Sequence, residues 1–257
     1  PLILTRGQIE DQRRTSNEKS IVSVFDEVGF NTYWVSTQQR ETAMASINHF
    51  TAEADVVRAG ARLLNDTRAY HYAANPLAWS ADLGDMTPAT WEDFSQLPEG
   101  GEYILKGARA DKGRWSRMHA RGRAGAIALR SELQADTGMR AETIVARAYV
   151  PLRVLGDGFG GCPIADEHRV FVVDGEVVAR GAYWPAGDCT TAPTPSAEIP
   201  ESFLREATAR IGARIRWYAL DVARTAAGDW IVIEVNDGQR SGLSEVPALE
   251  LYRSEER

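Results

Sequence analysis

The sequence predicts an α+β protein made of two units, a small α/β unit over residues 1–98 and a larger α+β unit over residues 99–257. In the larger unit, strand-like apolar runs come in pairs joined by short turns, at residues 168–179 and 217–237, which is typical of antiparallel hairpins. Between the two pairs, residues 201–211 space their apolar side chains with a helical period and are followed by a glycine. Paired strands with an intervening helix favour the α+β class.

The smaller unit carries weaker patterns. Residues 16–28 are predicted to form a helix that Gly29 closes, and residues 32–35 are predicted to form a strand. Residues 75–101 are rich in Pro, Gly, Asp and Thr, a composition typical of loops. We interpret them as connecting chain between the two units.

A basic loop follows the first strand of the larger unit. The chain has 29 Lys and Arg residues, of which Lys19, Lys106 and Lys112 alone are lysines. Since Arg and Lys are interchangeable on most solvated surfaces, the two lysines of the loop suggest compact charges for phosphate oxygens. Residues 106–123 carry seven basic residues against one acidic residue, and glycines there let backbone N–H groups join in wrapping a polyphosphate. A solvated basic face or a nucleic-acid patch is the alternative.

The C-terminal hairpin is expected to bring two carboxylates together. If the four residues after Thr225 form its loop, Thr225 pairs with Trp230. Counting back in step, Asp221 then pairs with Glu234. Side chains alternate along a strand, so Asn236 joins these two carboxylates on one face. The apolar residues take the other face: Leu220, Val222, Ile231, Ile233 and Val235.

Two carboxylates and an amide oxygen within a few ångströms are unfavourable unless a cation lies among them. Hard oxygen ligands in this number suit magnesium, which one or two carboxylates commonly hold together with nucleotide phosphates. The pattern therefore predicts a Mg²⁺ site at Asp221, Glu234 and Asn236. The alternative is an ordinary half-exposed ribbon whose polar face meets water.

In their order along the chain, these elements resemble the ATP-grasp superfamily over about residues 99–251. The elements that carry the resemblance are the strand ending at Lys106, the basic loop with Lys112, the strand at residues 144–150, the hairpin at residues 168–179, and the ending Asp221 to Asn236. The resemblance implies an ATP-grasp fold, in which two α+β lobes at about residues 99–148 and 149–257 enclose ATP. It also implies a small N-terminal α/β domain in front of them.

The resemblance assigns roles to the charged residues. Lys106 contacts the inner phosphates of ATP, and Lys112 with Gly113 closes over the outer phosphates. Arg169 stabilises the transferring phosphoryl group. One or two magnesium ions are held by the predicted metal ligands: Asp221, Glu234 and Asn236.

The resemblance also places the adenine between the lobes, against a hinge strand. The hinge residues expected beside it are Ala146, Arg147, Ala148 and Tyr149. Many family members start this hinge with a glutamate, and this chain has Ala146 and Arg147 there. The candidates for the ribose contact are then Asp157 and Glu167.

The chemistry that the resemblance implies is ATP-dependent ligation. A carboxylate attacks the γ-phosphate to give an acyl phosphate, which an amine captures, so the expected partners are a small-molecule carboxylate and an amine, such as an amino acid or a peptide. Arg240, next to Ser241, is the candidate catalytic residue that holds the substrate carboxylate. The alternative for Arg240 is a salt bridge at the rim. Two other functions stay open, a phosphotransferase that acts on a hydroxyl and a nucleotide-binding protein without turnover.

Composition limits the remaining classes. The formal net charge of −7 argues against nucleic acid as a general partner. No apolar run approaches the roughly 20 residues of a membrane span and no signal-peptide pattern is seen, so we expect a cytoplasmic protein without a membrane partner. Cys162 and Cys189 are expected to be free thiols. A homodimer is left open.

Overall fold

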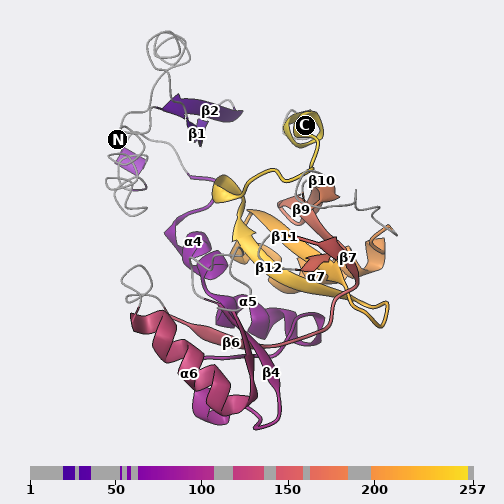
Figure 1. Cartoon of the computed structure of the whole chain (residues 1–257). Helices are drawn as coiled ribbons and strands as arrows, with labels where there is room; N and C mark the ends of the chain where they lie inside the picture. The colour runs from indigo at the N-terminus through magenta and orange to yellow at the C-terminus, as the bar shows by residue number, and fades with distance from the viewer. Residues whose placement is uncertain are drawn as a thin grey trace.

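The computed structural model describes the following residues: 20–26, 29–35, 53, 57–58, 63–106, 118–135, 143–158, 163–184 and 198–253. Their architecture confirms the predicted α+β class, because helices pack on antiparallel sheets (Figure 1). Two four-stranded sheets carry the fold. Among the helices of the described part, none has the length and apolar character that a membrane span requires.

The first sheet has the strand order β3-β6-β4-β5 and lies beside helix α6, in the lower part of Figure 1. Its elements are β3 (Thr90–Trp91), η2 (Phe94–Gln96), β4 (Glu102–Lys106), β5 (His119–Arg121), α6 (Gly122–Ala135) and β6 (Val145–Ala148). Ala126, Leu129 and Leu133 recur with helical spacing on one side of α6, and all three are buried. They share one apolar core with Leu105 and Ala146, so this core anchors the strand that ends at Lys106.

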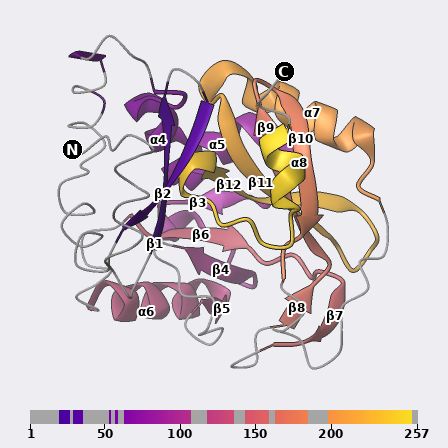
Figure 2. The same ribbon diagram turned by 90° about the horizontal axis from the view of Figure 1, so that it is seen from above.

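The second sheet has the strand order β10-β9-β11-β12, which makes β12 an edge strand. Its elements are β9 (Glu167–Val173), β10 (Glu176–Ala182), α7 (Glu201–Ile211), η6 (Gly212–Arg214), β11 (Trp217–Arg224), β12 (Trp230–Asp237), η7 (Gly238–Arg240) and α8 (Ala248–Arg253). Both predicted hairpins and the predicted helix are confirmed. Leu204 of α7 packs with Leu220 on one face of the sheet, while Leu251 of α8 packs with Phe171 on the other, and Figure 2 shows α8 over β9 and β10.

Two further helices pack on the α7 face of this sheet. They are α4 (Thr67–Ala74) and α5 (Pro76–Leu83), followed by the short helix η1 (Gly84–Met86). The expectation of connecting chain over residues 75–101 is wrong, because turn-forming residues there act as helix caps. Asn75 accepts a hydrogen bond from the Leu77 N–H at the start of α5, and Trp79 and Leu83 are buried in the sheet's core. The division of the chain at residues 98 and 99 stays a prediction.

An antiparallel hairpin, β1 (Ser20–Asp26) and β2 (Gly29–Val35), precedes these elements, with Asp26 opposite Gly29. The helix predicted over residues 16–28 is therefore wrong for residues 20–26, and its other residues lie outside the described ones. The Val, Ile and Phe residues of this segment favour a strand, and Gly29 begins the returning strand instead of ending a helix. The strand predicted at residues 32–35 is confirmed as part of β2.

Candidate nucleotide and metal site

Strands β11 and β12 place two carboxylates opposite each other through an irregular pairing. Trp230 pairs with Arg224, so its predicted pairing with Thr225 is wrong by one residue. Asp221 nevertheless pairs with Glu234, as predicted. Both observations hold because β12 contains one extra residue between these two points, a β-bulge. The longer loop and the bulge offset each other.

The extra residue is Ile233, and it changes which faces the apolar side chains of β12 take. Val232 is buried in the core of the second sheet, whereas Ile231 and Ile233 line a pocket outside that core. The prediction that Ile231 and Ile233 share the core face is wrong for this reason, since a one-residue shift reverses the faces of a strand. The other predicted core residues are confirmed: Leu220, Val222 and Val235.

Asp221 is fully buried and binds the guanidinium of Arg169 on the neighbouring strand β9. Nε and Nη2 of Arg169 donate to the two carboxylate oxygens of Asp221, both at 2.8 Å. The third nitrogen, Nη1, donates to the Gly242 carbonyl at 2.7 Å, and Asn236 Nδ2 donates to Oδ2 of Asp221 at 3.2 Å. Burial opposes the charge on Arg169, but hydrogen bonding and attraction to Asp221 outweigh it and raise the pKa of this guanidinium.

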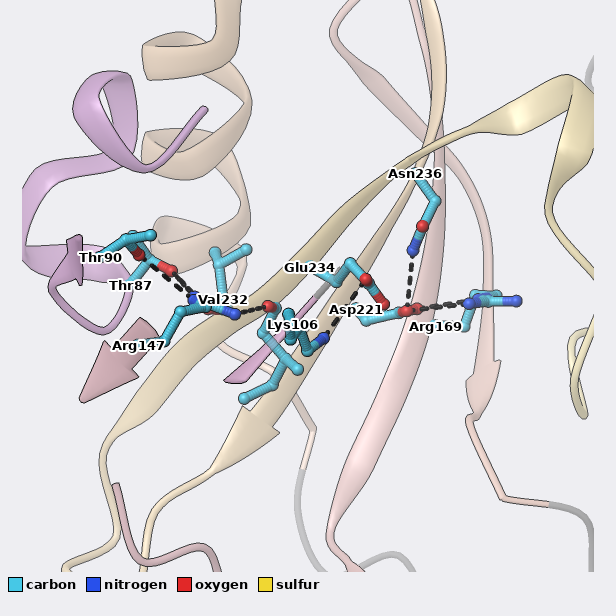
Figure 3. Close-up of polar contacts among 10 residues, drawn as sticks. Thr87, Thr90, Lys106, Arg147, Arg169, Asp221, Val232, Glu234 and Asn236 are labelled. Atoms are coloured by element: carbon cyan, nitrogen blue, oxygen red, sulfur yellow. Dashed lines mark hydrogen bonds and ion pairs between the residues drawn. The ribbon is translucent and has the colours of Figure 1, made fainter. Parts of the chain in front are cut away.

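Lys106 reaches from the first sheet to the second. Its Nζ lies 3.3 Å from Oε1 of Glu234, so the ion pair joins the end of β4 to β12 (Figure 3). The lysine side chain is nearly buried, whereas the glutamate keeps 28% of its side chain exposed. The predicted phosphate lysine and a predicted metal ligand therefore lie together.

An apolar pocket opens beside this ion pair. Residues of both sheets line it, together with the two-stranded ribbon of β7 (Val154–Asp157) and β8 (Pro163–Ala165). Its apolar lining includes Ile104, Met118, Leu152, Ala165, Ile231 and Ile233. Apolar walls with a few polar groups at one end are typical of sites for small organic ligands.

The two ribose candidates differ in position. Glu167 is buried and lines the pocket. Asp157 ends β7, is exposed and is not part of the pocket lining. The structure therefore brings Glu167, and not Asp157, to the pocket.

The hinge strand β6 lies inside the first sheet, between β3 and β4. The Ala148 N–H donates to the Ala89 carbonyl and the Tyr149 N–H to the Glu102 carbonyl, both at 2.8 Å. These two amides are therefore occupied by pairing within the first lobe. The adenine contacts stay a prediction for the remaining backbone groups between Ala146 and Tyr149.

Arg147, in the hinge strand, is almost completely buried. Its Nη1 donates to the Ile233 carbonyl, and its Nη2 donates to Thr87 Oγ1 at 2.7 Å. The guanidinium lies over the ring of Trp79, 4.9 Å from the ring centre. Burial lowers the pKa of Arg147 to about 10. This arginine therefore connects β6 of the first sheet to β12 of the second.

A family model for an ATP-grasp domain, described as family 3 of its clade, matches residues 96–254, more than half of the chain. The chain belongs to the ATP-grasp family. This match confirms the resemblance and the ATP-grasp fold predicted from the sequence. A comparison with curated proteins found no match.

Several solved structures of ATP-grasp proteins are similar to this chain at low identity. The macrocyclase MdnB from Microcystis aeruginosa MRC is 16% identical, with a TM-score of 0.45 over 94% of this chain and 83% of that chain. D-cycloserine synthetase DcsG is 16% identical, with a TM-score of 0.47 over 84% of this chain and 79% of that chain. The ATP-grasp ligase PsnB, complexed with minimal precursor, is 18% identical, with a TM-score of 0.45 over 80% of this chain and 64% of that chain. At such identities the likeness concerns the fold alone.

Some predicted site residues of this ATP-grasp protein are not placed. Lys112 and Gly113 lie outside the described residues, and so does the side chain of Arg240. The backbone of Arg240 ends η7, directly after β12, and Ser241 Oγ donates to the Asp237 carbonyl at 2.9 Å. The roles of these residues stay predictions.

Two residues near the site were not foreseen from the sequence. The ring centre of Tyr183 lies 4.8 Å from the Arg169 guanidinium. Its position just after the second strand of a hairpin, beside another aromatic residue, is a signal that could have indicated it. Thr87 lies 60 residues from Arg147, and no local pattern marks it.

Proposed function

We propose that this ATP-grasp protein is an ATP-dependent ligase that joins a carboxylate to an amine through an acyl phosphate and releases ADP and phosphate. The observation that carries the proposal is the meeting of Lys106 with Glu234 between the two sheets (Figure 3). The buried pair of Arg169 and Asp221 lies on the adjacent strands. Phosphoryl transfer depends on positioning and charge neutralisation, and this arrangement offers cations and carboxylates at one end of an apolar pocket.

The pocket and the charged residues suggest an orientation for ATP. In the proposal, the base occupies the apolar pocket, Glu167 binds a ribose hydroxyl, and the phosphates extend toward Lys106. Lysine suits this place, because an ammonium on a flexible stem can turn from Glu234 to a phosphate. Lys112 and Gly113 are proposed to close over the outer phosphates, while Arg169 faces the transferring phosphoryl group.

The donor atoms at this end of the pocket fit magnesium. Asp221 accepts three hydrogen bonds, so about one of the roughly four lone-pair positions of its carboxylate is left for a cation. Glu234 and the amide oxygen of Asn236 add further hard oxygen donors. Among the described residues, no group of three His, Cys, Asp or Glu side chains is placed to hold a metal, and the predicted site has two carboxylates and an amide. A magnesium ion bound there would supply charge neutralisation for the γ-phosphate.

The proposed reaction has two steps. An oxygen of the substrate carboxylate attacks the γ-phosphorus, and the bond from that phosphorus to the ADP oxygen breaks. The amine then attacks the acyl carbon and loses a proton, and phosphate leaves with the former carboxylate oxygen. Arg240 is proposed to hold the carboxylate through two N–H groups. The substrate class is a small carboxylate, such as an amino acid, with an amine or a peptide as the second substrate.

Transfer of oxygen-18 tests this mechanism. Phosphate release with ATP first identifies active acids from a pool of amino acids, and the active acid is then labelled in its carboxylate. The ligase mechanism requires label in the released phosphate. A kinase would give ADP and a phosphorylated product without free phosphate, and a binding protein would give neither. Product formation with unlabelled phosphate would refute the acyl phosphate.

A further inference from the structure

The bulge in β12 decides which way Glu234 points. Counted from the loop, an unbulged β12 would place Ile233 opposite Asp221 and Glu234 opposite Leu220. Leu220 lies in the apolar core, so that register would turn the glutamate away from Asp221 and into the core. The extra residue is therefore what brings the two carboxylates to one face.

Two side chains from outside the hairpin bind the bulge. Thr87 Oγ1 donates to the Val232 carbonyl at 2.8 Å, and Arg147 donates to the Ile233 carbonyl. Arg147 also donates to Thr87 Oγ1, so the two residues form one hydrogen-bonded unit (Figure 3). In a regular antiparallel strand, consecutive carbonyls point to opposite sides. At the bulge, two consecutive carbonyls accept from this same unit.

We propose that Arg147 and Thr87 are positioning residues that hold the β12 bulge and thereby direct Glu234 toward the metal and the phosphates. The unit is independent of the hairpin, because Arg147 lies in β6 and Thr87 follows η1. Buried carbonyls that lack strand partners need donors from elsewhere, and these two side chains provide them. The inference rests on the proposed function, which gives the placement of Glu234 its purpose.

The chain offers matched substitutions for this unit. Arg147→Lys keeps the charge, but an ammonium cannot reproduce the planar fork that binds two acceptors at fixed angles. Thr87→Val keeps the shape and removes the bridging hydroxyl. Thr90→Val is the control, because Thr90 Oγ1 accepts from Arg147 at 3.3 Å but makes its other hydrogen bonds with Ser80 and Pro88 instead of β12.

Binding of ADP, measured by calorimetry with magnesium and with EDTA, tests the proposal without turnover. The readout is the factor by which magnesium tightens ADP binding. Arg147→Lys and Thr87→Val are expected to reduce this factor about 10-fold, as the loss of a supporting residue commonly does to a metal site. Thr90→Val should leave it unchanged. A loosened fold alone would weaken ADP binding equally with and without magnesium, and that result for the first two variants would overturn the proposal.

Glu234→Gln separates this inference from the proposed function. If this variant abolishes the magnesium effect while Arg147→Lys and Thr87→Val retain it, the metal role stands and the positioning role is refuted. If the wild type shows no magnesium effect, the metal role fails, and the positioning role fails with it. Thr87→Val changes one hydroxyl only, so it decides the question should Arg147→Lys not fold.

Discussion

Arg169 and Asp221 lie opposite each other on β9 and β11 and are joined by two parallel hydrogen bonds in an almost fully buried ion pair. A second pair with the same two-bond geometry, Arg216 with Asp174, lies at the surface with more than half of each side chain exposed. The chain therefore contains a buried and an exposed version of one interaction. The two versions should differ in their effect on stability.

Asp221→Asn is expected to lower the free energy of unfolding by about 3 kcal/mol, because it leaves the Arg169 charge buried without a counter-charge. Asp174→Asn should cost at most about 1 kcal/mol, since solvent screens the exposed pair. Urea denaturation of both variants measures the difference. Equal losses would contradict the argument from burial.

Glu234→Gln should abolish turnover and leave the fold intact, because the amide removes a charge while it keeps the shape. The test combines ATP turnover at several magnesium concentrations with thermal unfolding of the variant. An unchanged melting temperature with no turnover is the expected result. Turnover near that of the wild type would sink the metal assignment.

Lys112→Ala should weaken ATP binding or slow phosphoryl transfer far more than Lys19→Ala. Only Lys112 is proposed to lie at the phosphates, and a charge-assisted contact contributes about 1.5–3 kcal/mol. Steady-state kinetics with ATP compare the two variants. Effects of equal size would place Lys112 on a solvated surface.

Glu167→Gln should weaken binding of ATP about 10-fold, because a hydrogen bond from a ribose hydroxyl to a charged acceptor contributes about 1.5–3 kcal/mol. The affinity for an ATP analogue that lacks that hydroxyl should change little. Asp157→Asn is the control, since that side chain is exposed and outside the pocket lining. Competition binding with 2′-deoxy-ATP and 3′-deoxy-ATP measures both. If Glu167→Gln binds ATP like the wild type, the ribose assignment is wrong.

The sequence predicts the pairing of Asp221 with Glu234 for a reason that is only half complete. A regular hairpin with a four-residue loop predicts this pair, and the structure reaches it with a longer loop and a bulge. Alternation along a strand indicates which side chains share a face, but it cannot reveal an inserted residue. For this reason the pair is predicted correctly, while Ile231 and Ile233 are assigned to the wrong face.

Contacts between distant segments were beyond the reach of the sequence patterns. Arg147 binds Thr87 and Ile233, which lie 60 and 86 residues away along the chain. Local composition also misled the prediction for α5, where Asn75 and Pro76 resemble a loop but start a helix. A short polar residue before proline fits both a turn and a helix start, and only the burial of Trp79 distinguishes them here.

The position of β12 at the end of its sheet has a consequence for solution behaviour. An uncovered strand edge is a template to which a strand of another molecule can add, the first step of many forms of aggregation. On this edge the bulge interrupts the regular spacing, and Arg147 and Thr87 occupy two of its carbonyls. The contacts that position Glu234 thus also guard the protein against self-association along this edge.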